Sequence, residues 1–440
     1  MGVKRVWSTA GVVGLTGALL LTSAPVASAD YIRDAQWPLT VYNAEKVWST
    51  SKGAGATVAV VDTGVNASHP DLTGQVLSGK DFTGEGDPHR DRDGHGTGMA
   101  SLIAGHGHGV SGSAGVMGLA PKAKILPVRA PTSEHDMNTA AWAEGVRYAV
   151  DQGASVINLS FNDHGAYPGS KGAKAIQYAQ KNNVVVVAGT GNDGGTVNYP
   201  AALPGVVAVT AIDESLNLWD DSNIGKGVTL AAPGAKIPRA DPPSPGGYAN
   251  ASGTSDATAY VSAIAALIRS KYPDLTAGQV INRMIKSASF VHHGDLKAPD
   301  DEYGYGIARP GTALTMDIPK GPKEGPLAQA PSSTTTNSGK ASEGNGSSAN
   351  QAKKKKSSSS GILVIAGIAA VVVIGGIVFA VIRSRRNRGN GGPGGGTHPQ
   401  DIGYPNQPPY PTAQQPYPTA APGQARNSNL YGEQPPHQGQ

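Results

Sequence analysis

The carboxylate of Asp62 and the imidazole of His95 have the chemistry and the positions that suit proton transfer at the edge of a sheet. Asp62 ends the apolar run ATVAVVD, which is typical of a buried strand, and His95 begins the apolar helical pattern in DGHGTGMASLIAG. An imidazole accepts the proton of a hydroxyl when an acceptor such as a carboxylate holds its other nitrogen. The glycines on either side, Gly94 and Gly96, let the backbone come close, and Thr97 can serve the start of the helix.

The hydroxyl of Ser255 suits the attack on a carbonyl, and the amide of Asn192 suits the binding of the oxyanion that results. Ser255 begins the apolar pattern in SGTSDATAYVSAIAALI, where a helix N-terminus presents free N–H groups and a partial positive charge. Asn192 follows the buried-strand pattern NVVVVAG in a glycine-rich loop, and its amide can donate to an oxyanion. The four residues together therefore point to nucleophilic acyl transfer.

Each of these residues, taken alone, also has an ordinary structural explanation. Asp62 and Asn192 suit turns, His95 suits a solvated helix start, and Ser255 suits a helix cap. The nucleophilic interpretation of Ser255 depends on the other three residues, because a helix cap needs none of them.

Short β-branched runs alternate with helical patterns through the middle of the chain. This alternation predicts an α/β domain with a parallel sheet, in which ligands bind at the carboxyl ends of the strands. The expected strands are 56–62, 123–129, 154–160, 183–189 and 205–212, and the expected helices between them are 137–152 and 170–181.

The order Asp, His, Asn, Ser and the motifs around these residues resemble the subtilisin-like serine proteases, or subtilases. The matching motifs are VVDTGV, HGTGMA, GNDG and SGTS, supported by NYPAALPGVVAVTA, LAAPG and YGYGIARP. The resemblance covers about residues 45–315. It implies a subtilisin-like three-layer α/β fold with a mostly parallel central sheet, and the hydrolysis of peptide bonds.

The resemblance also implies a role for each residue. Asp62 is expected to orient the imidazole, His95 to act as general base and then general acid, and Ser255 to attack the carbonyl. Asn192 and the Ser255 backbone N–H are expected to bind the oxyanion. The substrate cleft is expected to be lined by the backbone of Ser160, Phe161, Asn162, Ala188, Gly189 and Gly191.

Four positions depart from the family pattern. Many subtilases have a second histidine where Gly98 stands, and a proline where Ala259 stands. Alanine favours a helix interior, so we expect the helix after Ser255 to continue through Ala259. Asn162 replaces a usual glycine and is expected to narrow the cleft.

Asp256 stands beside the nucleophile, where an apolar residue is usual. An Asp in the first turn of a helix is electrostatically favoured. It would raise the pKa of His95 if it lay close, and it would oppose the oxyanion if it faced the oxyanion site. We expect its carboxylate to point away from Asn192.

The ends of the chain have the composition of targeting and membrane segments. A basic start, a short apolar stretch and Ala-Ser-Ala before residue 30 indicate a signal peptide, and the apolar residues 361–382 are long enough to span a bilayer. The predicted segments are a signal peptide (1–29), an N-terminal extension (30–54), the protease domain (55–318), a disordered linker (319–360), a transmembrane helix (361–382) and a disordered, Pro-rich cytoplasmic tail (383–440).

This layout, with the extension DYIRDAQWPLTVYNAEKVWS, resembles the mycosins, the membrane-anchored subtilases of type VII secretion systems. Mycosins usually carry disulfides, whereas this chain has no cysteine. The resemblance implies a single-pass protein of the cell membrane, with the protease domain outside, a protein or peptide substrate, and the type VII secretion machinery as a partner. No nucleic-acid partner is expected, because basic residues that flank 361–382 account for the net charge of +4.

No cofactor is expected for this chemistry. By resemblance to loops of some subtilases, the acidic stretch 81–93 is a candidate for structural calcium, although no ligand set can be assigned to it. The histidines of GHGHG (105–109) lack a further ligand cluster, so no metal site is expected there. Two functions remain open. One is an active endopeptidase, and the other is a subtilase-fold scaffold that stabilises a membrane secretion complex with little or no catalysis, which Asp256 and Asn162 favour.

Overall fold

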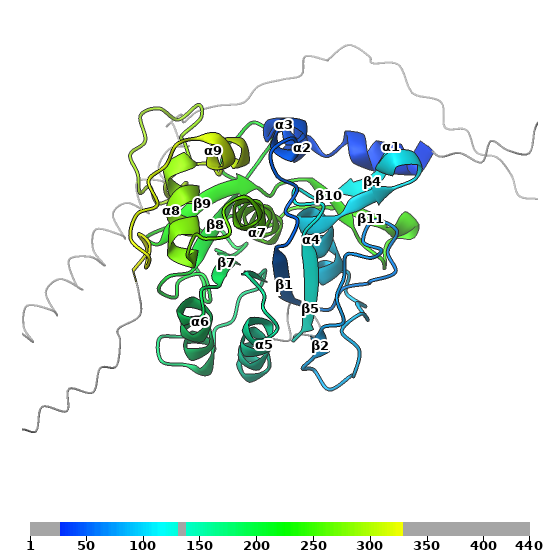
Figure 1. Cartoon of the computed structure of the whole chain (residues 1–440), viewed down its shortest axis with the longest axis horizontal. Helices are drawn as coiled ribbons and strands as arrows, with labels where there is room; N and C mark the ends of the chain where they lie inside the picture. Colours follow the sequence, from blue (N-terminus) through cyan, green and yellow to red (C-terminus); the bar gives the residue numbers. More distant parts are fainter. Residues whose placement is uncertain (1–26, 131–137, 329–440) are drawn as a thin grey trace, which may run out of the picture. The chain divides into compact units, whose positions relative to one another are not determined.

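A seven-stranded parallel sheet runs through the part of the chain that the structure describes (Figure 1). The structure is a computed structural model, and it describes residues 27–130 and 138–328. The strand order is β2-β5-β1-β6-β7-β8-β9, and neighbouring strands pair in parallel. The strands are β1 (Thr57–Asp62), β2 (Lys80–Asp81), β5 (Lys124–Arg129), β6 (Val156–Leu159), β7 (Val185–Gly189), β8 (Val207–Ile212) and β9 (Val228–Pro233). The five strands predicted from the sequence are confirmed.

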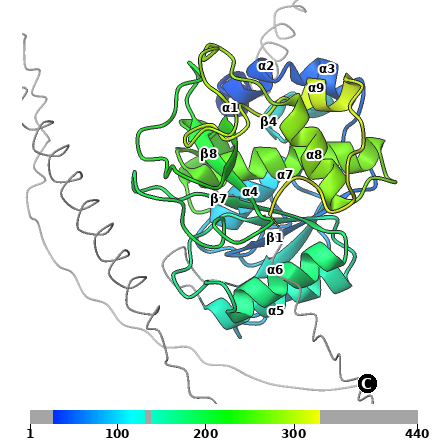
Figure 2. The ribbon, with the colours of Figure 1, turned by 90° about the vertical axis from the view of Figure 1, so that its left-hand side faces the viewer.

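Helices cover both faces of this sheet and give the predicted three layers (Figure 2). Helices α5 (Thr139–Asp151) and α6 (Lys171–Lys181) pack on one face, and α4 (His95–Ala104), α7 (Thr254–Lys271) and α8 (Ala277–Ser287) pack on the other. Side chains alternate between the faces of a strand. Val58 and Val60 of β1 accordingly join the core around α7, while Ala59 and Val61 join the core around α5 and α6.

Helix α7, which begins beside the predicted nucleophile, is the central helix of its layer. Fifteen of its 18 residues are buried, and most of them are alanine or another apolar residue. A helix that is apolar on all sides belongs in a core. The helix continues through Ala259 without interruption, as expected. The position of Ser255 is therefore set by a rigid element that contacts β6, β7, β8 and β9.

The N-terminal extension packs on the domain as three short helices, α1 (Ala27–Asp34), α2 (Trp37–Val41) and α3 (Ala44–Trp48). The side chain of Gln36 exchanges two hydrogen bonds with the backbone of Met117, at 3.1 and 2.9 Å. The indole of Trp37 donates to Ala235 O (3.2 Å), and the indole of Trp48 donates to Leu119 O (2.9 Å). These contacts make the extension part of the folded domain.

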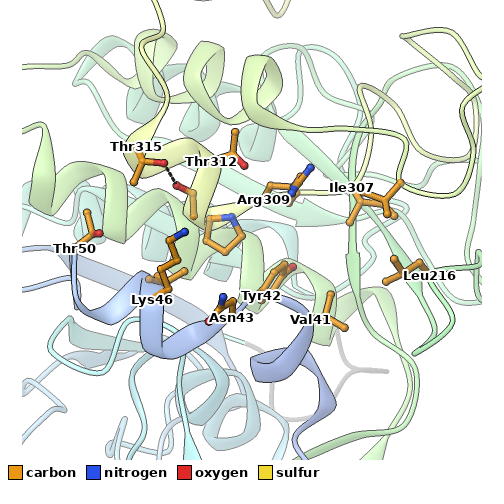
Figure 3. Close-up of a pocket in the computed structure, with 15 residues that line it drawn as sticks. Val41, Tyr42, Asn43, Lys46, Thr50, Leu216, Ile307, Arg309, Thr312 and Thr315 are labelled. Atoms are coloured by element: carbon orange, nitrogen blue, oxygen red, sulfur yellow. Dashed lines mark hydrogen bonds between the residues drawn. The ribbon is translucent and has the colours of Figure 1, made fainter.

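A pocket of about 350 Å³ lies where the extension meets helix α9 (Pro310–Thr315), as Figure 3 shows. Its walls come from α2, α3 and α9, together with the residues that precede α9. The side chains of Lys46 and Arg309 line it together with apolar groups of Val41, Tyr42 and Ile307. The extension thus builds surface features of the domain in addition to covering its core.

Two antiparallel hairpins, which the sequence reading did not predict, complete the domain. Strand β3 (His106–His108) pairs with β4 (Ala114–Met117), and β10 (Ile237–Ala240) pairs with β11 (Tyr248–Ala251). One-turn 3₁₀ segments lie at Val110–Gly112 and Pro245–Gly247. Strand β10 lies along α4 and leads through β11 to Ser255, so this hairpin joins the two helices that carry His95 and Ser255.

Contacts with the domain extend past residue 318, where we predict the disordered linker to begin. Polar side chains of helix α8 and its N-cap donate hydrogen bonds to three backbone carbonyls beyond residue 318, those of Pro319, Gly321 and Lys323. The linker prediction is therefore wrong for residues 319–328, because polar side chains of α8 bind that backbone. The remainder of the linker, the tail, residues 361–382 and residues 1–26 lie outside the described residues. Within 27–130 and 138–328, no helix is long and apolar enough to cross a membrane.

Candidate active site

The predicted site residues gather at the carboxyl ends of neighbouring strands. Asp62 is the last residue of β1, Ser160 follows β6, and Asn192 lies in the loop after β7. Since β1, β6 and β7 are adjacent and parallel, their carboxyl ends share one edge of the sheet. The N-terminus of α7 brings Ser255 to the same edge, where it contacts the backbone of Ser160. Ligands of open α/β sheets bind at this edge.

Asp62 and His95 form a buried hydrogen-bonded pair. His95 Nδ1 lies 2.8 Å from Asp62 Oδ1, and the two residues are 8% and 2% exposed. The backbone N–H of Thr63 donates to the same carboxylate oxygen at 2.8 Å and fixes its orientation. Because a carboxylate accepts, Nδ1 carries the proton, and Nε2 is left as the acceptor. This is the tautomer that a general base requires.

The surroundings of His95 raise its pKa above the ordinary value of 6.5. Burial of the imidazole lowers the pKa, but the charge and the hydrogen bond of Asp62 outweigh burial. Arg239 lowers the pKa and Asp256 raises it, each through its charge. The imidazole therefore lies in a field made by three charged side chains, two of which come from the β10 and α7 elements.

The start of α4 can approach β1 because residue 96 is a glycine. A Cβ on Gly96 would lie 2.1 Å from the carbonyl oxygen of Gly64, a distance that no side chain tolerates. Asp91, which the sequence reading missed, binds this start. Its carboxylate accepts from the N–H groups of Gly94 and Thr97, both at 2.8 Å. An acidic residue four positions before the first helical residue is a signal that could have identified it.

Ser255 is half-buried in the first turn of α7 and is held by a polar network beneath it. Its hydroxyl donates to Ser160 O at 3.3 Å, and the Ser160 hydroxyl donates to Ser255 O at 3.1 Å. Asn158 donates to the Ser160 hydroxyl (2.9 Å) and accepts from Ser262 (2.9 Å). In the described part of the chain no hydrogen bond joins Ser255 to His95. Catalytic hydrogen bonds often form or tighten only when substrate is bound.

The side-chain amide of Asn192 is oriented by Thr254. Both the backbone N–H and the hydroxyl of Thr254 donate to Asn192 Oδ1, at 2.8 and 2.9 Å. Because a backbone N–H can only donate, the oxygen of the amide faces Thr254 and the NH₂ group lies on the other side. The position of a Cβ on Gly253 would be 3.4 Å from Asn192 Nδ2 and 3.6 Å from the Ser255 backbone N, so these two donors border the same space.

A pocket of about 290 Å³ opens beside Ser255. Its lining includes four of the residues predicted for the substrate cleft or its floor: Ser160, Phe161, Asn162 and Gly189. Asn192, Asp193, Thr254 and Ser255 line it as well. Asn162 is half-buried on this wall, and its narrowing of the cleft stays a prediction.

Ala188 and Gly191, the other two cleft predictions, lie next to this pocket without lining it. The side chain of Ala188 is fully buried in the core beneath α5 and α6. The N–H of Gly191 donates to the hydroxyl of Thr254 at 3.2 Å, so this backbone group serves the orientation of Asn192. Backbone contacts of both residues with a substrate remain predictions.

Asp256 points away from Asn192, as predicted, and pairs with Arg239. Asp256 Oδ1 lies 3.0 Å from Arg239 Nη1, and the Asp256 side chain is 1% exposed. Burial raises the pKa of Asp256, while the charge of Arg239 opposes this effect. The sequence reading missed Arg239, since only the hairpin of β10 and β11 brings it to α7.

The acidic stretch 81–93 binds donors of the chain itself. Asp81 accepts from Thr83 and from the N–H of Gly86, and Glu85 pairs with Arg129. His106 bonds to backbone carbonyls, and His108 Nδ1 lies 2.6 Å from Asp71. Among the residues described, no group of three or more His, Asp or Glu is arranged to hold a metal ion.

The three-layer fold, the Asp–His pair and a serine at a helix N-terminus define a serine hydrolase of the parallel α/β class. Residues 53–306 match Peptidase S8, the subtilase family. Since the match covers more than half of the chain, the chain belongs to the subtilase family and is a serine endopeptidase.

Two sequence relatives match most of this domain. Thermitase from Thermoactinomyces vulgaris is 40% identical over 243 residues, which make up 55% of this chain and 84% of that protein. Subtilisin DY from Bacillus licheniformis is 34% identical over 258 residues, or 57% of this chain and 90% of that protein.

Mycosins are among the solved structures that resemble this chain. MycP1 from Mycobacterium smegmatis aligns with a TM-score of 0.56 and 30% identity, over 66% of this chain and 87% of that chain. The MycP3 protease from the type VII (ESX-3) secretion system aligns with a TM-score of 0.56 and 32% identity, over 64% of this chain and 88% of that chain.

Proposed function

We propose that this chain is a mycosin-like endopeptidase that hydrolyses peptide bonds of exported or cell-envelope proteins through Asp62, His95 and Ser255. The observation that carries the proposal is the 2.8 Å hydrogen bond between His95 Nδ1 and Asp62, which leaves Nε2 free to accept a proton at the edge of the sheet where Ser255 lies. For the proton transfer, the Ser255 hydroxyl must leave Ser160 O and turn toward the imidazole.

The reaction begins when Ser255 Oγ bonds to the carbonyl carbon of the substrate and its proton moves to His95 Nε2. The electron pair of the C=O bond moves to the oxygen, which accepts hydrogen bonds from Asn192 Nδ2 and the Ser255 N–H. The C–N bond then breaks, and the proton on Nε2 passes to the leaving amine. A water molecule, deprotonated by His95, attacks the acyl-serine, and the proton returns to Ser255 as the acid leaves.

The proposed location rests on the sequence and on the mycosin neighbours. The N-terminal residues have the pattern of a signal peptide, and residues 361–382 have the length and apolarity of a membrane span. MycP1 and MycP3 come from type VII secretion systems. We therefore propose a single-pass protein of the cell membrane, with the protease domain outside, the tail inside, and the type VII machinery as a partner.

A scaffold that stabilises a secretion complex with little catalysis is the second candidate function. It is favoured by one observation: the Ser255 hydroxyl bonds to Ser160 O and has no hydrogen bond with His95 in the described structure. The two functions differ in what a Ser255→Ala substitution does. If secretion continues while substrate cleavage stops, the endopeptidase function is established. If Ser255→Ala leaves both the cleavage products and secretion unchanged, the scaffold function is supported instead.

A fluorophosphonate probe tests the proposed nucleophile directly. We expect the full-length protein to be labelled at Ser255, and we expect Ser255→Ala and His95→Ala to lose the label. Ser252→Ala is the matched control, because Ser252 is an exposed serine three residues away. Failure of a folded protein to react at Ser255 would contradict the proposal.

A further inference from the structure

Arg239 and Asp256 form an ion pair to which the reaction described above assigns no role. Arg239 Nη1 lies 3.0 Å from Asp256 Oδ1, and the two side chains are 15% and 1% exposed. Burying two charges costs desolvation energy that their attraction often only offsets, so a buried pair by itself is weak evidence for stability. Asp256 directly follows Ser255, and the pair therefore lies at the start of the helix that carries the nucleophile.

The guanidinium group of Arg239 occupies space that is open because residue 98 has no side chain. A Cβ on Gly98 would lie 2.8 Å from Arg239 Cδ and 3.0 Å from Nε. Gly98 belongs to the first turn of α4 and follows His95 by three residues. Ala240 N also donates to Ser101 Oγ at 3.1 Å, which ties β10 to α4. The pair thus connects the first turn of α7 with the turn of α4 that bears His95.

We propose that Arg239 and Asp256 are a charge-balanced positioning pair for His95, and that their balance sets the lower limit of the pH range in which the enzyme works. This inference rests on the proposed role of His95 as general base. Neither residue touches substrate or transfers a proton. Both act on the imidazole through their charges and by holding α4 and α7 in register.

The charges that face His95 come from four elements. Asp62 of β1 bonds to Nδ1, and Asp93, in the loop before α4, accepts from the His95 backbone N–H at 3.3 Å. Arg239 comes from β10 and Asp256 from α7, and they act on the pKa of His95 in opposite directions. Within the described residues, Arg239 is the cation that opposes these three carboxylates in the field at the imidazole.

The opposite signs make the two single substitutions distinguishable. Asp256→Asn leaves Arg239 without its partner, so the pKa of His95 falls and activity persists to lower pH. Arg239→Met removes the cation, so the pKa of His95 rises and the acid limb of the pH–rate profile moves to higher pH. If Asp256 takes up a proton in Arg239→Met, that variant should match the double variant, and Asp256→Asn, which keeps the charge of Arg239, carries the test. The double variant Arg239→Met/Asp256→Asn has neither charge and stays close to the wild type.

The experiment follows the acid limb of kcat/KM in the full-length protein for the wild type, both single variants and the double variant. We expect the limb to move by about 0.5 pH unit or more, downward in Asp256→Asn and upward in Arg239→Met, with near cancellation in the double variant. A second readout is the titration of the His95 imidazole by NMR with ¹⁵N-labelled histidine in a Ser255→Ala background. It does not depend on turnover.

Matched controls separate this effect from loss of structure. Arg239→Lys keeps the charge and should keep the limb in place even where kcat falls. Arg283→Met removes another buried guanidinium, which lies on α8 and donates to Ala313 O and to the hydroxyl of Tyr272. It should lower thermal stability without moving the limb. Asp256→Asn is nearly isosteric, and it keeps the test open if Arg239→Met does not fold.

Two outcomes would overturn the inference: both single variants lower kcat without moving the limb, or both move it in the same direction. If the wild type hydrolyses no peptide but the NMR titration shifts in opposite directions, the proposed function fails while the effect of the pair on His95 stands. Hydrolysis with no shift in either readout overturns the pair alone.

Discussion

Thr254 donates two hydrogen bonds to one atom, Asn192 Oδ1, and thereby fixes which side of the amide faces the pocket. Thr254 immediately precedes Ser255, so the residue that orients the proposed oxyanion donor is the neighbour of the proposed nucleophile. The two proposed oxyanion donors, Asn192 Nδ2 and the Ser255 N–H, keep a fixed relation. The Ser255 N–H belongs to the first turn of a buried helix, and Asn192 binds that turn through Thr254.

Asn192→Ala should lower kcat by about 10²–10³ with little change in KM, because an oxyanion donor acts mainly in the transition state. The substitution also leaves the N–H and the hydroxyl of the buried Thr254 without their acceptor, so it should destabilise the domain by about 1–3 kcal/mol and lower the melting temperature. Steady-state kinetics and thermal unfolding measure the two effects. Asn192→Asp keeps the size of the side chain but removes the donor, and it should be as slow. A variant of unchanged kcat would exclude Asn192 from this role.

Thr254→Val should lower kcat by roughly tenfold, since it removes the hydroxyl that binds both Asn192 Oδ1 and the N–H of Gly191. Thr254→Ser keeps the hydroxyl and should retain most of the activity. Combined with Asn192→Ala, the Thr254→Val change should cost little more, because residues that act as a unit are not additive. Additive losses in the double variant would show that Thr254 acts independently of the amide.

The raised pKa of His95 predicts that the acid limb of kcat/KM lies above pH 6.5. The general base must be neutral, so activity appears as the pH rises through the pKa of the folded protein. Stability has the opposite sign. A histidine with a raised folded-state pKa contributes stability fully below its unfolded pKa and loses it as pH rises through the folded value. A pH–rate profile and pH-dependent unfolding of the wild type and His95→Ala measure both, and a limb below pH 6.5 would contradict the assignment.

Gly96→Ala should destabilise the domain by about 1–3 kcal/mol or more and abolish activity, because its Cβ would lie 2.1 Å from Gly64 O. Denaturant unfolding measures the loss. Gly294→Ala is the control: a Cβ there meets no atom within 4 Å, so its unfolding curve should match that of the wild type. Normal stability of Gly96→Ala would mean that α4 and β1 can separate at no cost.

Trp37→Ala should destabilise the domain by about 3–5 kcal/mol, the range for removing a buried large aromatic side chain. Trp37 is 9% exposed and its indole donates to Ala235 O. The matched control is Tyr31→Ala, since Tyr31 is 65% exposed on the same extension. Thermal unfolding that distinguishes the two would establish the extension as a structural part of the domain, and equal melting temperatures would contradict this.

The sequence alone predicted the strands and helices that carry the site, because buried parallel strands are continuous apolar runs and helices repeat with a different period. It also predicted that Asp62 ends a strand, that Asn192 follows a strand, and that His95 and Ser255 begin helices. The ends of parallel strands share one edge of the sheet, so those four positions were enough to predict that the residues lie near one another. The direction of Asp256 was predicted correctly as well.

Only the tertiary structure decided what lies around these residues. Arg239 reaches Asp256 through a hairpin with no strong sequence signal, and it fits there because Gly98 leaves room three residues after His95. The docking of helices α1, α2 and α3 on the domain depends on contacts such as that of Gln36 with Met117, which are 81 residues apart. Local patterns follow from backbone periodicity along a few residues, whereas buried charge pairs and docked segments depend on long-range packing. The sequence thus determined which residues can do chemistry, and the packing of β10 and α7 decided the charges that surround His95.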